Sequence, residues 1–145
     1  VQAADLVFRK LSNKNGNIID KFLSIIKSEV NSNNEKVKPF VEQFDYYIDI
    51  LSKFSEWTIE KAKTNKNDVS AAANDYLKTL GYVSLAFAWV KVLNISFKDY
   101  EQNKKFYDSK INTAKFYFDK VLPRAEQHYK SAISGSSNIM NFKFN

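Results

Sequence analysis

The sequence predicts an all-α protein: an up-down four-helix bundle preceded by a short N-terminal helix. Only 3 Gly and 2 Pro occur among 145 residues, which is fewer turn residues than β-sandwiches, barrels and glycine-lined nucleotide folds need. Apolar residues also recur at spacings of three and four over long stretches, the period of amphipathic helices. The hydrophobic share of 44% is that of a globular domain, and a chain of this length can bury a core.

The first three predicted helices occupy the N-terminal half of the chain. The first runs from the N-terminus to Leu11. The second has an apolar stripe over residues 18–30, and it ends in the asparagine-rich segment 31–34, whose side chains favour turns. The third opens near Pro39, because proline is tolerated in a first helical turn, and its apolar face covers residues 40–54.

The fourth predicted helix begins at an N-cap formed by Asn67 or Asp68. From Leu77 to Leu93 it is apolar nearly all round. A helix of this kind must be covered on several sides. We therefore expect it to be the central helix of the domain, or the helix that docks onto a missing neighbour.

The fifth predicted helix begins at Ser96, where the sequence up to Asp99 resembles a capping box. Its apolar residues recur at helical spacing from Tyr107 to Tyr129. Pro123 interrupts this pattern and predicts a kink at Leu122, because proline removes a backbone donor and clashes with the preceding turn. The segment 134–137 ends the helix. An apolar tail follows, and it needs a surface to lie on: Ile139, Met140, Phe142 and Phe144.

Composition and charge exclude several functional classes. Cys is absent, which excludes disulfide scaffolds and thiolate sites. The net charge is +6, but the only arginines among the 22 basic residues are Arg9 and Arg124, and nucleic-acid readers favour clustered Arg. The start has no signal-peptide features, and the apolar run 80–90 is too short to span a bilayer. We expect a soluble, cytoplasmic domain, cut from a longer protein, with no nucleic-acid and no membrane partner.

Two groups of residues are candidates for metal or acid-base chemistry. His128 is the only histidine, and it lies among polar neighbours near a helix end, so we expect it to be solvated. Glu42, Asp45 and Asp49 share one helix, but bundle metal sites use Glu-x-x-His motifs on facing helices, and none occurs. We expect these acids to pair with Lys38 and Lys53 in solvent, so no metal-binding residue is predicted.

Two further patterns have a structural explanation. The Ser-Gly-Ser-Ser segment 134–137 follows a helix, whereas a phosphate cradle precedes one. Five aromatic residues could stack bases, but at helical spacing most of them are expected in the core: Phe106, Tyr107, Phe116, Tyr117 and Phe118. From composition and periodicity alone, the chain is a helical bundle with no readable function.

Two segments nevertheless resemble acyl-CoA dehydrogenases. The segment 2–11 reads Gln-Ala-Ala-Asp-Leu-Val-Phe-Arg-Lys-Leu and resembles the start of the last helix of the catalytic unit in bacterial members. The segment 107–118, followed by Leu122-Pro123, is similar to the Lys-x-x-Thr-Ala-x-Phe-Phe and Leu-Pro pattern of an extra C-terminal domain in one branch. Gly81 and Trp89 lie where that domain tends to carry Gly and Trp.

The resemblance implies a flavoenzyme whose chemistry lies upstream of this chain. Such enzymes bind FAD, remove the α-proton of an acyl-CoA thioester with a Glu, and pass a hydride from the β-carbon to flavin. In the branch resembled here, that Glu belongs to a Tyr-Glu-Gly-Thr segment a few residues before the position matching Val1. The resemblance therefore predicts no catalytic residue in this chain and only Gln2 as a cofactor-binding residue. It also implies that Asp5 and Arg9 fix the first helix against its neighbours. Phe8 departs from the family, which often has Gly there.

We therefore expect residues 1–14 to be the end of the last helix of the catalytic unit, and residues 15–145 to be a C-terminal helical bundle. Its partners would be the upstream unit of the same polypeptide and a second copy in a homo-oligomer. One alternative is a free-standing helical interaction module without enzymatic role. Another is a weak nucleic-acid binder, whose affinity would fall steeply with salt.

Overall fold

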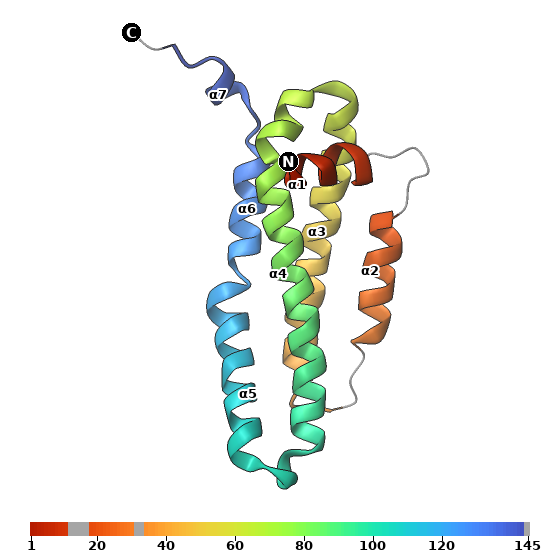
Figure 1. The fold of residues 1–145 in the computed structure, drawn as a ribbon, viewed down its shortest axis with the longest axis vertical. Coiled ribbons are helices and arrows are strands. Elements are labelled where there is room, and N and C mark those ends of the chain that lie inside the picture. The colour runs from red at the N-terminus through yellow and green to blue at the C-terminus, as the bar shows by residue number, and fades with distance from the viewer. Residues whose placement is uncertain (12–17, 31–33, 144–145) are drawn as a thin grey trace.

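The computed structural model describes residues 1–11, 18–30 and 34–143, and these residues form helices and connecting turns without a strand. Three long rods lie side by side: α3 (Lys38–Thr64), α4 (Lys66–Lys98), and the consecutive helices α5 (Lys104–Phe116) and α6 (Arg124–Ile133) (Figure 1). The shorter α2 (Ile18–Glu29) packs against α3. The predicted all-α bundle is confirmed.

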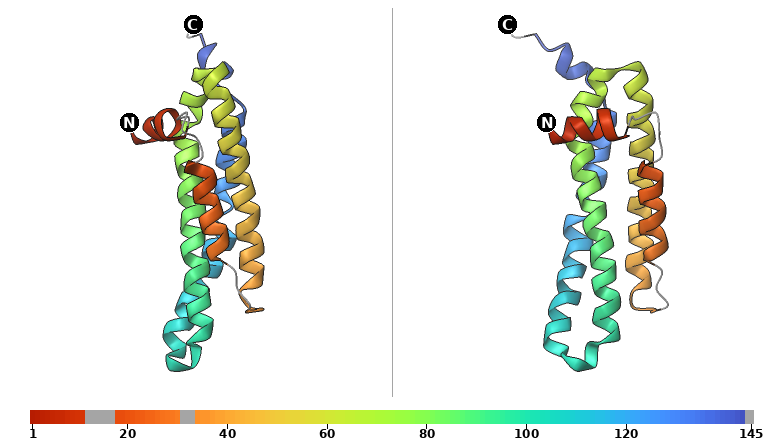
Figure 2. Two further views of the ribbon diagram at one scale, coloured as in Figure 1. Left: turned by 90° about the vertical axis from the view of Figure 1, so that its right-hand side faces the viewer. Right: turned by 45° about the vertical axis from the view of Figure 1, so that its right-hand side comes forward.

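The first helix lies across the bundle instead of along it. It consists of α1 (Gln2–Asp5) and a π-helical continuation, η1 (Leu6–Leu11), and it crosses α4 and α3 near the end where these two helices connect (Figures 1 and 2). Val7 is fully buried there. Within the described chain, Asp5 and Arg9 pair with each other, since Arg9 Nη2 donates to Asp5 Oδ2 over 3.0 Å. The expected domain boundary at residue 14 lies outside the described residues.

The core lies between α4 and its neighbours α3, α5 and α6. Phe54 of α3 is fully buried, with its ring centroid 5.1 Å from that of Tyr76 and 5.4 Å from that of Tyr129. Tyr76 Oη donates to Ser55 Oγ over 2.8 Å, and Ser55 Oγ donates to the Leu51 carbonyl over 2.7 Å. Burial raises the pKa of Tyr76 to about 12, so this hydroxyl stays protonated and satisfied in an apolar setting.

Helix boundaries confirm some sequence signals and correct others. Pro123 breaks the last rod as expected. Helix α5 continues into a π-helical segment, η3 (Tyr117–Val121), and α6 begins after the proline. The Leu122 N–H donates to the Tyr117 carbonyl over 2.9 Å. The expected capping box at Ser96 is wrong. Ser96 is buried inside α4, which continues to Lys98, because its position falls on the buried face of a helix that packing extends.

The N-caps also differ from expectation. Asn65, not Asn67 or Asp68, caps α4, its side chain accepting from the Asn67 N–H over 3.1 Å. After a short 3₁₀ turn, η2 (Tyr100–Gln102), Asn103 caps α5 by accepting from the Phe106 N–H over 3.2 Å. Both caps are asparagines that end an extended connection, where a short polar side chain satisfies free helix donors.

Asp68 acts instead as a brace between the start of α4 and the end of α6. Its Oδ1 accepts from the Ser136 N–H over 2.9 Å and from Ser136 Oγ over 2.7 Å. Lys61 Nζ lies 3.4 Å from the other carboxylate oxygen. The hydrogen bonds from Ser136, with the nearby Lys61 charge, lower the pKa of Asp68. Gly135 has a φ of +78°, and a Cβ there would lie 3.2 Å from Asp68 Oδ1, so the turn requires glycine.

The chain beyond this brace, α7 (Ser137–Met140) and residues 141–143, projects from the bundle (Figure 1). Ile139, Met140 and Phe142 of the expected apolar tail are exposed. Phe144 lies outside the described residues.

Replacing Phe54 with Ala should lower the free energy of unfolding by about 3–5 kcal/mol, because a fully buried aromatic ring leaves a cavity among aromatic neighbours. The matched control is Phe116→Ala, since Phe116 is 61% exposed, and it should change stability by less than about 0.5 kcal/mol. Urea unfolding followed by circular dichroism measures both. Equal losses in the two variants would contradict the position of the core.

Asp68→Asn should unfold at a lower urea concentration than the wild type at pH 7. Because folding lowers the pKa of Asp68, its carboxylate contributes stability above the unfolded pKa of about 3.9, and that contribution disappears as pH falls through the folded pKa. The difference between the two proteins should therefore shrink as pH falls below about 4. Asp119→Asn, at an exposed carboxylate, is the control, and a constant difference at all pH values would contradict the brace.

Candidate functional site

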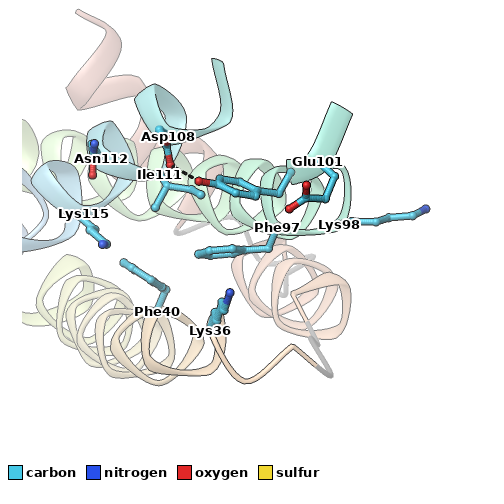
Figure 3. Close-up of a pocket in the computed structure, with 10 residues that line it drawn as sticks. Lys36, Phe40, Phe97, Lys98, Glu101, Asp108, Ile111, Asn112 and Lys115 are labelled. Atoms are coloured by element: carbon cyan, nitrogen blue, oxygen red, sulfur yellow. Dashed lines mark hydrogen bonds between the residues drawn. The ribbon is translucent and has the colours of Figure 1, made fainter. Parts of the chain in front are cut away.

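A groove of about 670 Å³ lies at the end of the bundle where α4 turns into α5. Three separate segments line it: the turn into α3 with its first residues, the end of α4 with η2, and the outer face of α5. Figure 3 shows the lining residues, which are Lys36, Phe40, Phe97, Lys98, Tyr100, Glu101, Asp108, Ile111, Asn112 and Lys115.

Apolar side chains form the inner walls of the groove. Phe40 is fixed by an edge-to-face contact with Phe118, at a centroid distance of 5.2 Å. Ile111 is buried in α5. Phe97 faces Phe40 across the groove, and Lys36 Nζ lies 5.6 Å from the centroid of the Phe97 ring (Figure 3). A flat apolar group would therefore meet ring faces on two sides.

The charges around the groove are unequally paired. Tyr100 Oη donates to Asp108 Oδ1 over 2.9 Å, and this hydrogen bond raises the pKa of Tyr100. Glu101 pairs with Lys104 over 3.0 Å. Both carboxylates therefore have partners, whereas Lys36 and Lys115 are within ion-pair distance of no carboxylate in the described chain.

These unpaired lysines define what the groove can bind. Figure 3 shows the ammonium group of Lys36 beside the Phe97 ring and that of Lys115 on the side of Phe40, while Lys98 extends away from the groove. Two cations beside apolar walls suit a ligand that joins an anionic group to a flat apolar body. Among the described residues that line the groove there is no His, Ser, Thr or Cys.

His128 lies elsewhere, and it is not solvated as expected. Its Nδ1 is 2.8 Å from Asp75 Oδ1, its ring stacks on Tyr82 at a centroid distance of 5.8 Å, and its side chain is only 22% exposed. The polar neighbours of His128 in the sequence lie on α6, whereas its contacts Asp75 and Tyr82 come from α4. No local pattern in the sequence connects the two helices. The cluster joins α6 to α4.

The acids of α3 form no metal site. Glu42 and Asp49 are exposed and Asp45 is half-buried, and the described chain contains no group of three or more His, Asp or Glu side chains that could hold a metal. Lys38 pairs with Glu35 over 2.5 Å, so the expected pairing with the acids of α3 is wrong for this lysine. Lys38 pairs instead with Glu35, which lies three residues earlier and just outside α3.

The aromatic residues of the last rod divide between core and surface. Tyr117 and Phe118 are buried and Tyr107 is half-buried, but Phe106 and Phe116 are exposed, which corrects the expectation that most of them are core. Tyr117 Oη donates to the Tyr82 carbonyl over 2.7 Å. These contacts fix α5 against α4 and leave two phenyl rings on the outer surface.

The first helix positions the one residue expected near a cofactor. Gln2 is exposed in the first turn of α1, and Phe8 is partly exposed on the same helix. A mostly apolar hollow of about 280 Å³ lies beneath this helix, between it and α2 and α4, with Leu6, Phe22 and Leu80 in its walls. The helix therefore rests on the bundle through apolar side chains.

The fourth helix is longer than its apolar run suggested. By length and composition α4 could cross a membrane, with 28% of its most apolar window buried. A mostly buried core helix of a soluble protein passes the same test, and one such helix is weak evidence for a membrane span. Within the described chain, α4 contacts α3, α5, α6 and the first helix.

The groove predicts binding of an anionic aromatic probe such as 8-anilinonaphthalene-1-sulfonate. Lys115→Glu should weaken that binding up to about fivefold at low salt, because a favourable charge becomes a repulsive one at a partly solvated site. Lys63→Glu, at the opposite end of α3, is the control. A fluorescence titration measures both, and equal affinity losses in the two variants would show that the probe binds elsewhere.

One comparison with known proteins identifies the family. A family model described as "Acetyl-CoA dehydrogenase C-terminal like" matches residues 18–143, from the first residue of α2 to the end of the described chain. No curated protein matches the chain in a sequence search. The match includes every helix that lines the groove, and among the described elements it leaves only the crossing first helix outside. Because it spans most of the 145 residues, this chain belongs to the Acetyl-CoA dehydrogenase C-terminal like family.

Proposed function

We propose that this chain is the C-terminal helical domain of an FAD-dependent acyl-CoA dehydrogenase-like protein, and that its own role is structural. The observation that carries this proposal is the family match over residues 18–143. The first helix adds to it, since residues 2–11 resemble the end of the catalytic unit and lie directly against the bundle through Val7 and Leu11.

The residues present do not amount to a flavin site. Gln2 is the only residue that the resemblance brings near the cofactor, and its exposed side chain supplies a single amide group. FAD is a large ligand that needs a mostly enclosed site with several convergent polar groups. The other residues of α1 are Ala3, Ala4 and Asp5, and Asp5 is already paired with Arg9. Flavin and thioester would be held by the upstream unit.

A structural role is supported by the apolar side chains that the described chain leaves uncovered. They occur on α2, on α4 and on α5: Ile18, Ile25, Leu85, Ile95, Phe106 and Phe116. Scattered single residues would need no explanation, but those of α4 lie on one helical face. Such a domain would cover part of a cytoplasmic catalytic unit or contribute to contacts between subunits.

A free-standing interaction module would use the same uncovered residues. The coding sequence just ahead of Val1 separates the two proposals, because an in-frame Tyr-Glu-Gly-Thr segment would join this domain to a dehydrogenase. Reading that sequence requires no assumption about the fold.

The isolated chain should not bind FAD, whereas the polypeptide that includes the upstream catalytic unit should purify with yellow flavin. Titrating FAD with the chain and following flavin fluorescence measures the first, and the visible absorption spectrum measures the second. In the longer protein, Gln2→Ala should reduce flavin retention, while Gln102→Ala on the exposed η2 turn should not. A tightly bound flavin on the 145-residue chain alone would overturn the proposal.

A further inference from the structure

One face of α4 and its C-cap carries a continuous line of residues that the bundle leaves exposed or half-buried. The residues alternate at spacings of three and four, which keeps them on one side of a helix. We call this line the α4 seam: Lys78, Gly81, Leu85, Ala88, Val92, Ile95 and Asp99. Its middle is apolar, and its two ends carry opposite charges.

The seam is open to solvent and rigidly held. Leu85 is 52% and Ile95 is 55% exposed, and a Cβ built on Gly81 would meet nothing within 4 Å. The residues that flank the seam are tied down on both sides. The Trp89 ring packs at a tilt against that of Tyr117 in η3, at a centroid distance of 6.3 Å, and Lys91 pairs with Glu29 of α2 over 2.7 Å.

The shape of the α4 seam is complementary to that of a second copy in the antiparallel orientation. In an antiparallel pair, residues equally distant from the centre face each other. With the centre at Ala88, the side chain of Ile95 from one copy lies over Gly81 of the other. Ala88 meets its own equivalent, and its small side chain lets the helices approach closely, as interdigitated packing requires.

The charges select the same arrangement. Antiparallel pairing brings Lys78 of each copy beside Asp99 of the other, whereas parallel pairing would place like charges together. Within the described chain, neither Lys78 nor Asp99 belongs to an ion pair. Both ends of the seam therefore keep their charge available for a partner, and the complementary charge lies on the same surface.

We propose that the α4 seam binds the α4 seam of a second copy of this chain in an antiparallel, two-fold symmetric contact. A two-fold contact uses the same patch on both copies, and this patch has the required complementarity in shape and charge. The contact rests on the structural role proposed above and deepens it, because it assigns the uncovered residues of α4 to a contact between subunits; its test needs neither flavin nor the upstream unit. Failure of one proposal is therefore distinguishable from failure of the other.

The absence of cysteine from the sequence allows a direct test with single-cysteine variants. Ala88→Cys places one thiol beside the two-fold axis, so oxidation with copper phenanthroline should give a disulfide-linked dimer. Ala71→Cys is the matched control, because it makes the same substitution at an exposed position of the same helix away from the seam. Non-reducing gel electrophoresis measures the linked fraction, and equal linking in both variants would overturn the proposal.

Charge reversal tests the antiparallel orientation without oxidation. Lys78→Glu and Asp99→Lys should each weaken the dimer about fivefold or more in analytical ultracentrifugation, and the double variant should restore it. Circular dichroism checks that each variant remains helical. A wild-type chain that stays monomeric at about 100 μM would also overturn the proposal, since stable dimers form well below that concentration.

A membrane surface is the competing occupant of an apolar helix face with basic neighbours. Sedimentation with phosphatidylcholine vesicles, with and without phosphatidylserine, tests it. The dimer should remain in solution with both kinds of vesicle. Vesicle binding by the wild type that Leu85→Glu abolishes, without self-association in solution, would assign the seam to lipid and overturn the two-fold contact.

Discussion

The burial of α4 between α3 and the α5–α6 rod is the constraint on which the rest of the structure depends. Val83, Ala86, Val90 and Leu93 of this helix are fully buried, and the hydrophobic effect is the main favourable term in folding. Every other element is placed by a contact with this helix or with its neighbours. The groove, the His128 cluster, the Asp68 brace and the α4 seam all lie on its surface or at its ends.

The polar contacts act on this core by fixing position. The Asp68 brace holds the end of α6 to the start of α4, and the His128–Asp75 contact holds α6 farther along the same helix. Tyr117 then joins α5 to the Tyr82 carbonyl. Such hydrogen bonds contribute modestly to the free energy of unfolding, but removing one partner would leave a buried polar group without a hydrogen bond, which is destabilising. They therefore determine the register of the last rod on α4.

Periodicity predicted the helices well because each apolar stripe is a local pattern that the bundle buries. The kink at Pro123 was predictable for the same reason, since proline acts on its own turn. The predicted capping box at Ser96 is wrong, because the same Ser-x-x-Asp spacing also occurs at the end of a helix that tertiary packing extends. The prediction that His128 is solvated was wrong because its partner Asp75 is 53 positions away in the sequence. The groove gave no sequence signal, since Lys36 and Lys115 meet only after α3 and α5 have packed.

The π-helical segment η3 determines which face of α6 meets α4. In a regular helix each residue turns the chain by about 100°, and η3 accommodates a residue more than an α-helical path would need. The buried positions Ala114, Phe118, Leu122 and Ala125 are separated by four, four and three residues. Shortening this stretch by one residue would rotate α6 about its own axis relative to α4. Ala125 and Ala132 would then rotate out of the interior, and His128 would lose its carboxylate, although no contacting residue had been altered.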